Sequence, residues 1–217
     1  MGVEPCVLCL RTDRPLTREH VFAHWLVRKV HGARLFPSDT PPNATRSSRP
    51  ATIARITADV CAECNAGWMS SLEVSFRQAV FARERVGMLW APDRTTLSRW
   101  FTKTALLLAH ARGAAFLSAT RRAQIVTGMP DGLEVFIARR RRPSQPLDFA
   151  LEVANLGSDG PRVESVVVQV DDVVAHVADR GTLASRHGTR LWPLRTHALR
   201  WETLPVVAVQ RLRPPNG

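Results

Sequence analysis

Two pairs of cysteines carry the first chemical information in this chain. Cys6 and Cys9 flank a two-residue gap, and Cys61 and Cys64 flank another. Such a gap lets both thiolates of a pair bind one metal ion, and two pairs supply the four sulfur ligands that tetrahedral zinc prefers. Because the sequence contains no other cysteine, we expect these four to hold one structural Zn²⁺.

Two alternatives to zinc remain open for these cysteines. The pairs would form disulfides in an oxidised protein, or they would be buried thiols without a metal. The chain does not start with a charged segment and an apolar run of the kind that directs export, so we expect a cytoplasmic protein with reduced thiols. A thioredoxin-like redox site uses one such pair and leaves the second unexplained.

Three polar residues are tied by sequence to these pairs. Glu19 and His20 follow the first pair, and Asn65 directly follows the second. Carboxylate and amide oxygens are ligands suited to Mg²⁺ or Mn²⁺, and a neighbouring imidazole can take a proton from water. A module folded around one zinc would bring the three side chains to one cleft.

Each of the three residues also has an ordinary structural role that the sequence leaves open. Glu19 could pair with Arg18 at the surface, and His20 could be a plain histidine at the start of a helix. Asn65 stands where a helix N-cap would be, and a ligand can also serve as a cap. Their occurrence together favours a shared site.

The order CxxC, Glu19-His20, CxxC-Asn65 resembles the zinc-bearing HNH endonucleases, whose ββα-metal core is often built on a treble-clef zinc module. The resemblance covers residues 6–85. It implies that His20 is the general base, that Glu19 and Asn65 hold a catalytic Mg²⁺ or Mn²⁺, and that the four cysteines bind the structural zinc. The implied reaction is hydrolysis of a DNA phosphodiester, leaving 5′-phosphate and 3′-hydroxyl ends.

The sequence departs from this family at two places. The family more often has Asp at the position of Glu19, and its middle Asn has no counterpart at 55–57. A degenerate zinc module that binds nucleic acid without cutting it is therefore the alternative function.

The charge balance points to a polyanionic partner. Lysine and arginine number 30 against 19 acidic residues, which gives a net charge of +11. We therefore expect DNA as the partner. A solvated loop remains the alternative for the run of four arginines before Pro143. The arginines expected to contact phosphates are Arg18, Arg46, Arg49, Arg55, Arg139, Arg140, Arg141 and Arg142.

Several other classes of protein are disfavoured. Four thiolates on zinc leave neither a nucleophilic cysteine nor an open zinc position. The chain has no tyrosine, which removes phosphotyrosine-forming recombinases, and no GxxxxGK[ST] run for ATP. Its longest apolar run, 105–109, is far shorter than the roughly 20 residues of a membrane span, so no membrane association is expected.

The elements that must position these residues follow from the spacing of apolar side chains. Helical spacing occurs over 20–30 and 65–85, and a long helix capped by Thr95 or Thr96 is predicted to run to 111 after a break at Pro92. A short strand is predicted within 51–60. Further strands are predicted at 133–137, 149–153, 163–170, 173–177 and 205–212.

These elements predict an α+β protein with a zinc module first, then long helices and a mostly antiparallel sheet. We expect a zinc-bound HNH-like nuclease module over 1–92 and an α+β accessory domain over 93–217. The accessory domain would bind DNA, sense a modification or form a homo-oligomer, and the sequence does not choose among these roles.

Overall fold

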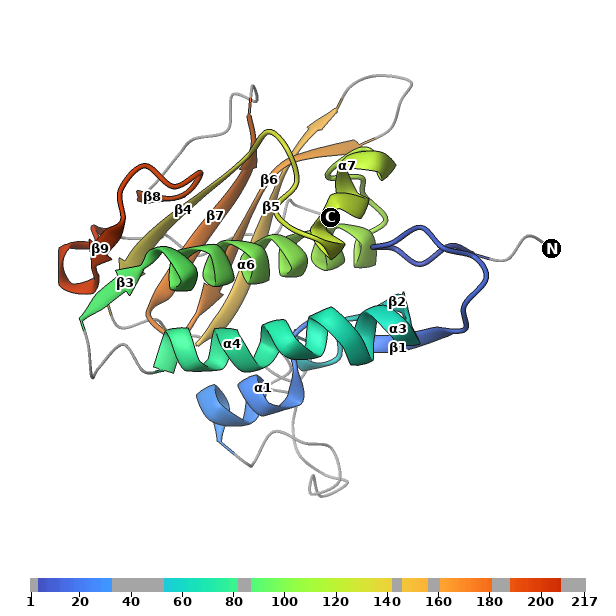
Figure 1. Cartoon of the computed structure of the whole chain (residues 1–217), viewed down its shortest axis with the longest axis horizontal. Coiled ribbons are helices and arrows are strands. Elements are labelled where there is room, and N and C mark those ends of the chain that lie inside the picture. The colour runs from blue at the N-terminus through green and yellow to red at the C-terminus, as the bar shows by residue number, and fades with distance from the viewer. Residues whose placement is uncertain are drawn as a thin grey trace, which may run out of the picture.

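The computed structural model of the protein describes residues 4–32, 53–81, 87–141, 146–155, 161–180 and 188–207. Within these ranges the chain forms a mixed α+β fold, as the sequence predicts. A small pair of N-terminal strands and several helices lie beside a larger curled sheet (Figure 1).

The N-terminal part is built on an antiparallel hairpin. β1 (Leu16–His20) pairs with β2 (Thr57–Cys61), and α1 (His24–His31) follows β1. The prediction of helix from His20 onward is wrong for its first residues, because His20 is the last residue of β1 and lies opposite Thr57. Pairing with a strand far along the chain overrides the local helical spacing there.

A kinked helical segment leads away from β2. It comprises α3 (Ala62–Cys64), a π-helical turn (Asn65–Met69) and α4 (Ser70–Phe81). Gly67 has non-helical angles, φ −89° and ψ −111°, and marks the kink. Beyond the kink, Leu72, Phe76 and Val80 recur every four residues on α4 and are buried, which agrees with the predicted apolar stripe. Residues 82–85 of the predicted helix lie outside the described part of the chain.

The longest helix, α6 (Ala91–Ala111), begins earlier than its sequence suggests. Pro92 does not break the chain but lies in the first turn, where its missing N–H costs nothing. The Asp93 carboxylate accepts the backbone N–H of Trp90 at 3.2 Å and so caps the helix, in place of the predicted Thr95 or Thr96. No helix in the described ranges is both long enough and apolar enough to cross a membrane.

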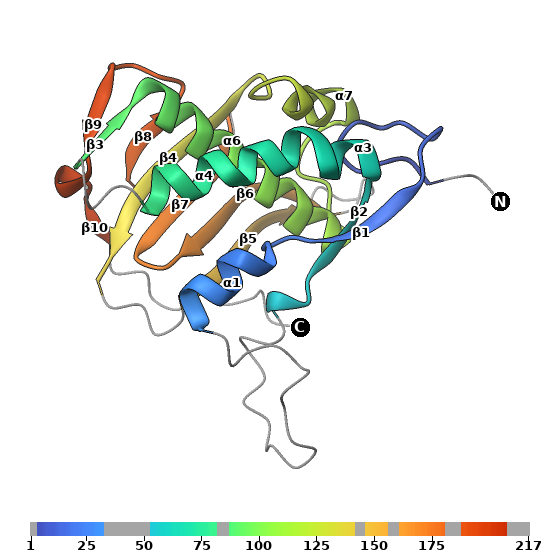
Figure 2. The ribbon, with the colours of Figure 1, turned by 60° about the horizontal axis from the view of Figure 1, so that its bottom comes forward.

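α6 lies between the N-terminal elements and the sheet (Figures 1 and 2). It contacts α4 and β2 on one side and four strands of the sheet on the other. The rings of Phe76 on α4 and Trp100 on α6 stack with centroids 3.7 Å apart, and Phe101 meets both edge-on. The predicted boundary between 92 and 93 therefore falls inside the first turn of a helix that both parts share.

The large sheet has the order β10-β4-β7-β6-β5, with β8 also beside β4. Its neighbours pair antiparallel except β10 with β4, which confirms the prediction of a mostly antiparallel sheet. Residues 208–212 of the last predicted strand lie outside the described ranges. The strands are β4 (Leu133–Arg140), β5 (Leu147–Asn155), β6 (Pro161–Val170), β7 (Val173–Asp179), β8 (Thr189–Trp192) and β10 (Val206–Val207).

Smaller elements close the sheet side of the molecule. β3 (Met88–Trp90) pairs antiparallel with β9 (Ala198–Arg200) just before α6 begins. A short helix, α7 (Ala119–Ala123), follows α6, and Arg121 on it forms an ion pair with the buried Asp179 at 2.7 Å. These contacts fix both ends of α6 against the sheet.

Candidate functional site

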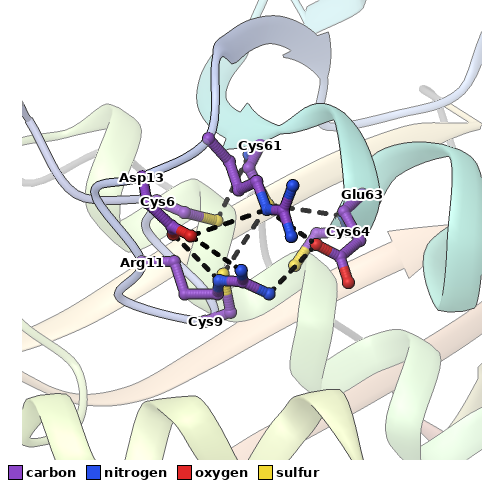
Figure 3. A network of polar contacts seen from close by, with 8 residues as sticks. Cys6, Cys9, Arg11, Asp13, Cys61, Glu63 and Cys64 are labelled. Carbon is purple, nitrogen blue, oxygen red and sulfur yellow. Dashed lines mark hydrogen bonds and ion pairs between the residues drawn. The ribbon is translucent and has the colours of Figure 1, made fainter.

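The four cysteines form one compact cluster, which Figure 3 shows in close-up. Cys6 and Cys9 lie in the loop before β1, Cys61 ends β2, and Cys64 ends α3. All four sulfur atoms lie within 4.8 Å of one another, and those of Cys9 and Cys61 are 3.6 Å apart. Sulfurs about 2.3 Å from a tetrahedral zinc would be separated by about 3.8 Å. The cluster can therefore hold a metal ion such as zinc.

Backbone geometry prepares these sulfurs to act as ligands. The backbone N–H of Cys61 donates to Cys6 Sγ at 3.3 Å, and that of Cys64 donates to Cys61 Sγ at 3.4 Å. Burial alone would raise the pKa of the Cys6 thiol, but backbone hydrogen bonds from Cys61, Cys9 and Leu8 outweigh it and lower the pKa. Burial raises the pKa of Cys9 and Cys64, so their ionisation requires the charge of a bound metal. All four thiols are unbridged, which disfavours disulfides.

Exposed ion pairs join the two cysteine loops outside the cluster (Figure 3). Arg11 bonds Asp13 at 2.8 Å and Glu63 at 3.1 Å, and Arg14 approaches Glu63 at 3.3 Å. The hydrogen bond from Arg11 lowers the pKa of Asp13 to about 2. Exposed pairs of this kind contribute little stability.

The structure brings Glu19, His20 and Asn65 together at one pocket of about 330 Å³. The Asn65 amide Nδ2 donates to Glu19 Oε2 at 2.8 Å, which joins the end of β1 to the π-helical turn. Asn65 has helical angles, φ −64° and ψ −57°, and its side chain is used on Glu19 rather than as a helix cap. The remaining lining residues are Trp25, Ala66, Met69, Ser70, Glu73 and Lys103.

His20 is held as a neutral imidazole at this pocket. Burial lowers its pKa, the neighbouring His24 lowers it further, and Glu19 opposes both effects. The rings of His20 and His24 have centroids 4.4 Å apart. A pKa below the usual value of about 6.5 leaves the ring unprotonated at neutral pH and able to accept a proton.

Sequence reasoning missed two charged residues in the pocket wall, Glu73 on α4 and Lys103 on α6. They form an ion pair of 2.6 Å, and the Lys103 side chain is only 2% exposed. The Glu73 carboxylate also accepts the indole N–H groups of Trp25 at 3.0 Å and Trp100 at 2.7 Å. In the sequence, Lys103 has apolar residues one helical turn before it and one helical turn after it. A lysine inside such an apolar stretch of helix requires a buried counter-ion, and this position was the signal that could have revealed the pair.

None of the predicted DNA-contacting arginines that the structure describes lines this pocket. Arg18 is exposed and lies 4.0 Å from Asp59, and Arg55 is exposed just before β2. Arg139 and Arg140 end β4 and Arg141 follows it, and this end of β4 lies on the opposite side of the molecule from β1 and α3 (Figures 1 and 2).

Two of those distal arginines also have partners on the sheet. Arg139 bonds Asp172 at 3.0 Å, and Arg140 donates to Gln169. Arg46, Arg49 and Arg142 lie outside the described residues. Phosphate contacts by the eight predicted arginines thus remain a prediction.

No family model, curated protein or solved structure matches the chain. Function must therefore be argued from the geometry of its own residues.

Proposed function

We propose that the protein is a metal-dependent endonuclease of the HNH type that hydrolyses DNA phosphodiester bonds. The observation that carries the proposal is the 2.8 Å contact of Asn65 with Glu19 in the pocket that His20 also lines. Glu19 and His20 are adjacent in sequence, Asn65 comes 46 positions after Glu19, and the three side chains meet at one pocket. If Asn65 were only an N-cap, Glu19 only a surface acid and His20 only the first residue of a helix, their side chains would not be expected to line one pocket.

The order of elements supports the same proposal. β1 and β2 form a hairpin, and α4 follows through the turn that carries Asn65. This is a ββα arrangement with the general base at the end of the first strand. The cysteine cluster ties the loop before β1 to the end of β2, so a structural Zn²⁺ there would hold the hairpin as a treble-clef module does.

The pocket contains the donors that a catalytic divalent metal needs. Glu19 offers carboxylate oxygens, and Asn65 offers its amide carbonyl oxygen while its NH₂ orients the carboxylate. Mg²⁺ commonly takes one or two protein oxygens and completes its shell with water and substrate phosphate. A bound Mg²⁺ or Mn²⁺ would stabilise negative charge on the scissile phosphate and on the leaving oxygen.

His20 supplies the proton transfer. Its unprotonated ring accepts a proton from the attacking water as the water oxygen bonds to phosphorus. The bond from phosphorus to the 3′-oxygen breaks, and that oxygen takes a proton from a solvent water molecule as it leaves, so the products carry 5′-phosphate and 3′-hydroxyl ends. The buried pair of Glu73 with Lys103 holds the pocket wall behind these groups.

The test is cleavage of supercoiled plasmid by zinc-loaded protein with Mg²⁺ or Mn²⁺. We expect nicking or linearisation that is absent without the added divalent metal. His20→Ala should lose roughly 100-fold or more of the rate, the usual contribution of a general base. His24→Ala is the matched control, because His24 contacts His20 but does not line the pocket, and it should keep most of the activity.

A second outcome corresponds to the non-catalytic zinc module. The position facing His20 across the hairpin is Thr57, in the part of the chain where the family's middle Asn is missing. DNA retention without cutting, unchanged in His20→Ala, would establish that binding module and overturn the nuclease.

A further inference from the structure

A second concave surface lies between α1 and α4, next to the candidate catalytic pocket. It is a groove of about 690 Å³. α1 lies between β1 and β2 in the sequence. None of the proposed catalytic residues, Glu19, His20 and Asn65, lines this groove. We name it the α1–α4 groove; its lining residues are Trp25, Arg28, Lys29, Val74, Arg77, Gln78 and Phe81.

The α1–α4 groove is strongly basic. Arg28, Lys29 and Arg77 line it, and no acidic residue of the described ranges does so. All three cations are exposed, and Val74 between them is 57% exposed. This composition suits an anionic polymer with apolar parts, because phosphates find positive charge while sugars or bases find aromatic and aliphatic surface.

Aromatic rings hold two of the cations in place. The Arg77 guanidinium lies 5.6 Å from the centroid of the Trp25 ring, and Lys29 Nζ lies 5.5 Å from that of Phe81. Cations already ordered over aromatic faces lose less side-chain entropy when they bind a phosphate. The geometry is thus prepared for an anion rather than for a neutral ligand.

Trp25 connects this groove to the catalytic pocket, because it lines both. Its indole N–H bonds Glu73 in the pocket wall, while its ring lies beneath Arg77 in the groove. A chain whose phosphate sits by His20 would therefore continue past Trp25 into the groove.

We propose that the α1–α4 groove binds the DNA backbone that flanks the scissile phosphate. The assignment of DNA and of a scissile phosphate rests on the proposed nuclease function. The occupant is argued from charge: among the residues that the structure describes, three cations and no acid line the groove. The groove also opens beside a pocket whose own chemistry suits a phosphodiester.

The test is a binding measurement in which no cutting takes place. Fluorescence anisotropy with a short labelled DNA duplex would be recorded over a series of salt concentrations in a His20→Ala background without added Mg²⁺. Lys29→Gln/Arg77→Gln removes two groove charges and keeps polar side chains. We expect at least about tenfold weaker binding, and a slope of log Kd against log salt smaller by about two.

The matched control removes the same charge elsewhere. Arg112 is exposed with its guanidinium 5.3 Å from the Phe149 ring, and Arg180 is exposed after β7. Arg112→Gln/Arg180→Gln should bind nearly as the parent does, with circular dichroism confirming that both double variants fold. An equal loss in both double variants would show a response to net charge alone and would overturn the groove assignment.

Two other outcomes separate this proposal from the nuclease proposal. Unchanged binding in Lys29→Gln/Arg77→Gln would overturn the groove, while the plasmid assay would still decide catalysis. Weakened binding in that variant, together with an inert wild-type protein, would support the groove as a DNA site and overturn only the nuclease.

Discussion

Asn65 donates its side-chain amide to the Glu19 carboxylate across 2.8 Å, although 46 positions separate the two residues in sequence. One follows the second cysteine pair directly, and the other precedes the end of β1. The contact therefore makes the geometry of the pocket depend on the cysteine cluster that anchors both segments.

Under the nuclease proposal, removing this contact should weaken binding of the proposed catalytic metal. In Asn65→Ala, Glu19 loses its orienting donor and the site loses one ligand oxygen. We expect the Mg²⁺ concentration for half-maximal cleavage to rise roughly 10- to 100-fold, the range found when partners of metal ligands are removed. Ser70→Ala, in the same pocket wall, is the control and should leave this concentration unchanged. A lower rate at an unchanged Mg²⁺ requirement would argue against Asn65 as a ligand.

The cysteine cluster should bind one zinc per chain. In Cys9→Ser we expect zinc content, measured by mass spectrometry, to fall well below one and tryptophan fluorescence to report unfolding near Trp68, which lies four residues after Cys64 in the π-helical turn. Structural zinc contributes about 10–16 kcal/mol in small zinc modules, which is comparable to the whole stability of a domain. Cys9→His restores a zinc ligand at a half-buried position and should keep the metal. Wild-type protein with no zinc and no free thiols after unfolding would point instead to two disulfides.

Glu73 and Lys103 should contribute to the stability of the fold as a charge pair, so that removing only one of them is more costly than removing both. Glu73→Gln leaves the Lys103 ammonium buried without a counter-ion, and we expect a loss of about 3–5 kcal/mol in the free energy of unfolding. Adding Lys103→Met to that variant removes the unpaired charge, so part of the loss should be recovered, although the introduced amide has one oxygen and can accept from only one of the two indoles. Urea denaturation of the wild type and the variants measures both values. Equal losses in the single and double variants would contradict a charge-pairing role.

Protonation of His20 should set the acid limit of cleavage. Burial and His24 depress its pKa, so the base form persists below pH 6.5 and activity should fall only as pH drops through that lowered pKa. His24→Gln removes the repulsion and part of the burial, so the midpoint of the acid limb should move to higher pH. Cleavage rates over a pH series measure this midpoint, with the exposed His110→Gln as control. A shift to lower pH would contradict the assigned cause.

Much of this arrangement could be predicted from the sequence, because it rests on short-range spacing. The two cysteine gaps predicted the cluster, and the four-residue recurrence of Leu72, Phe76 and Val80 predicted α4. The runs of β-branched residues likewise predicted strands such as β6 and β7, because the two-residue repeat of a strand can be recognised from neighbouring residues alone.

What the sequence did not predict depends on partners far along the chain. His20 ends a strand because Thr57 pairs with it, and the helical spacing around it does not contain that information. The residues next to Glu73 in sequence do not indicate that Lys103 and two indoles enclose its carboxylate. The α1–α4 groove also depends on contacts between distant parts of the chain. α1 precedes β2 in the sequence and α4 follows it, and the groove forms where these two helices lie together.

Sharing α6 between the two parts of the chain has an evolutionary consequence. Phe76 of the N-terminal part stacks on Trp100, while other faces of the same helix cover the sheet. Recombination at either end of α6 would separate this helix from the N-terminal part or from the sheet. The apolar residues of the separated part would then lose the surface that buries them. Relatives that exchanged the C-terminal sheet for a different domain would need a rebuilt α6, so we expect the two halves to have been inherited together.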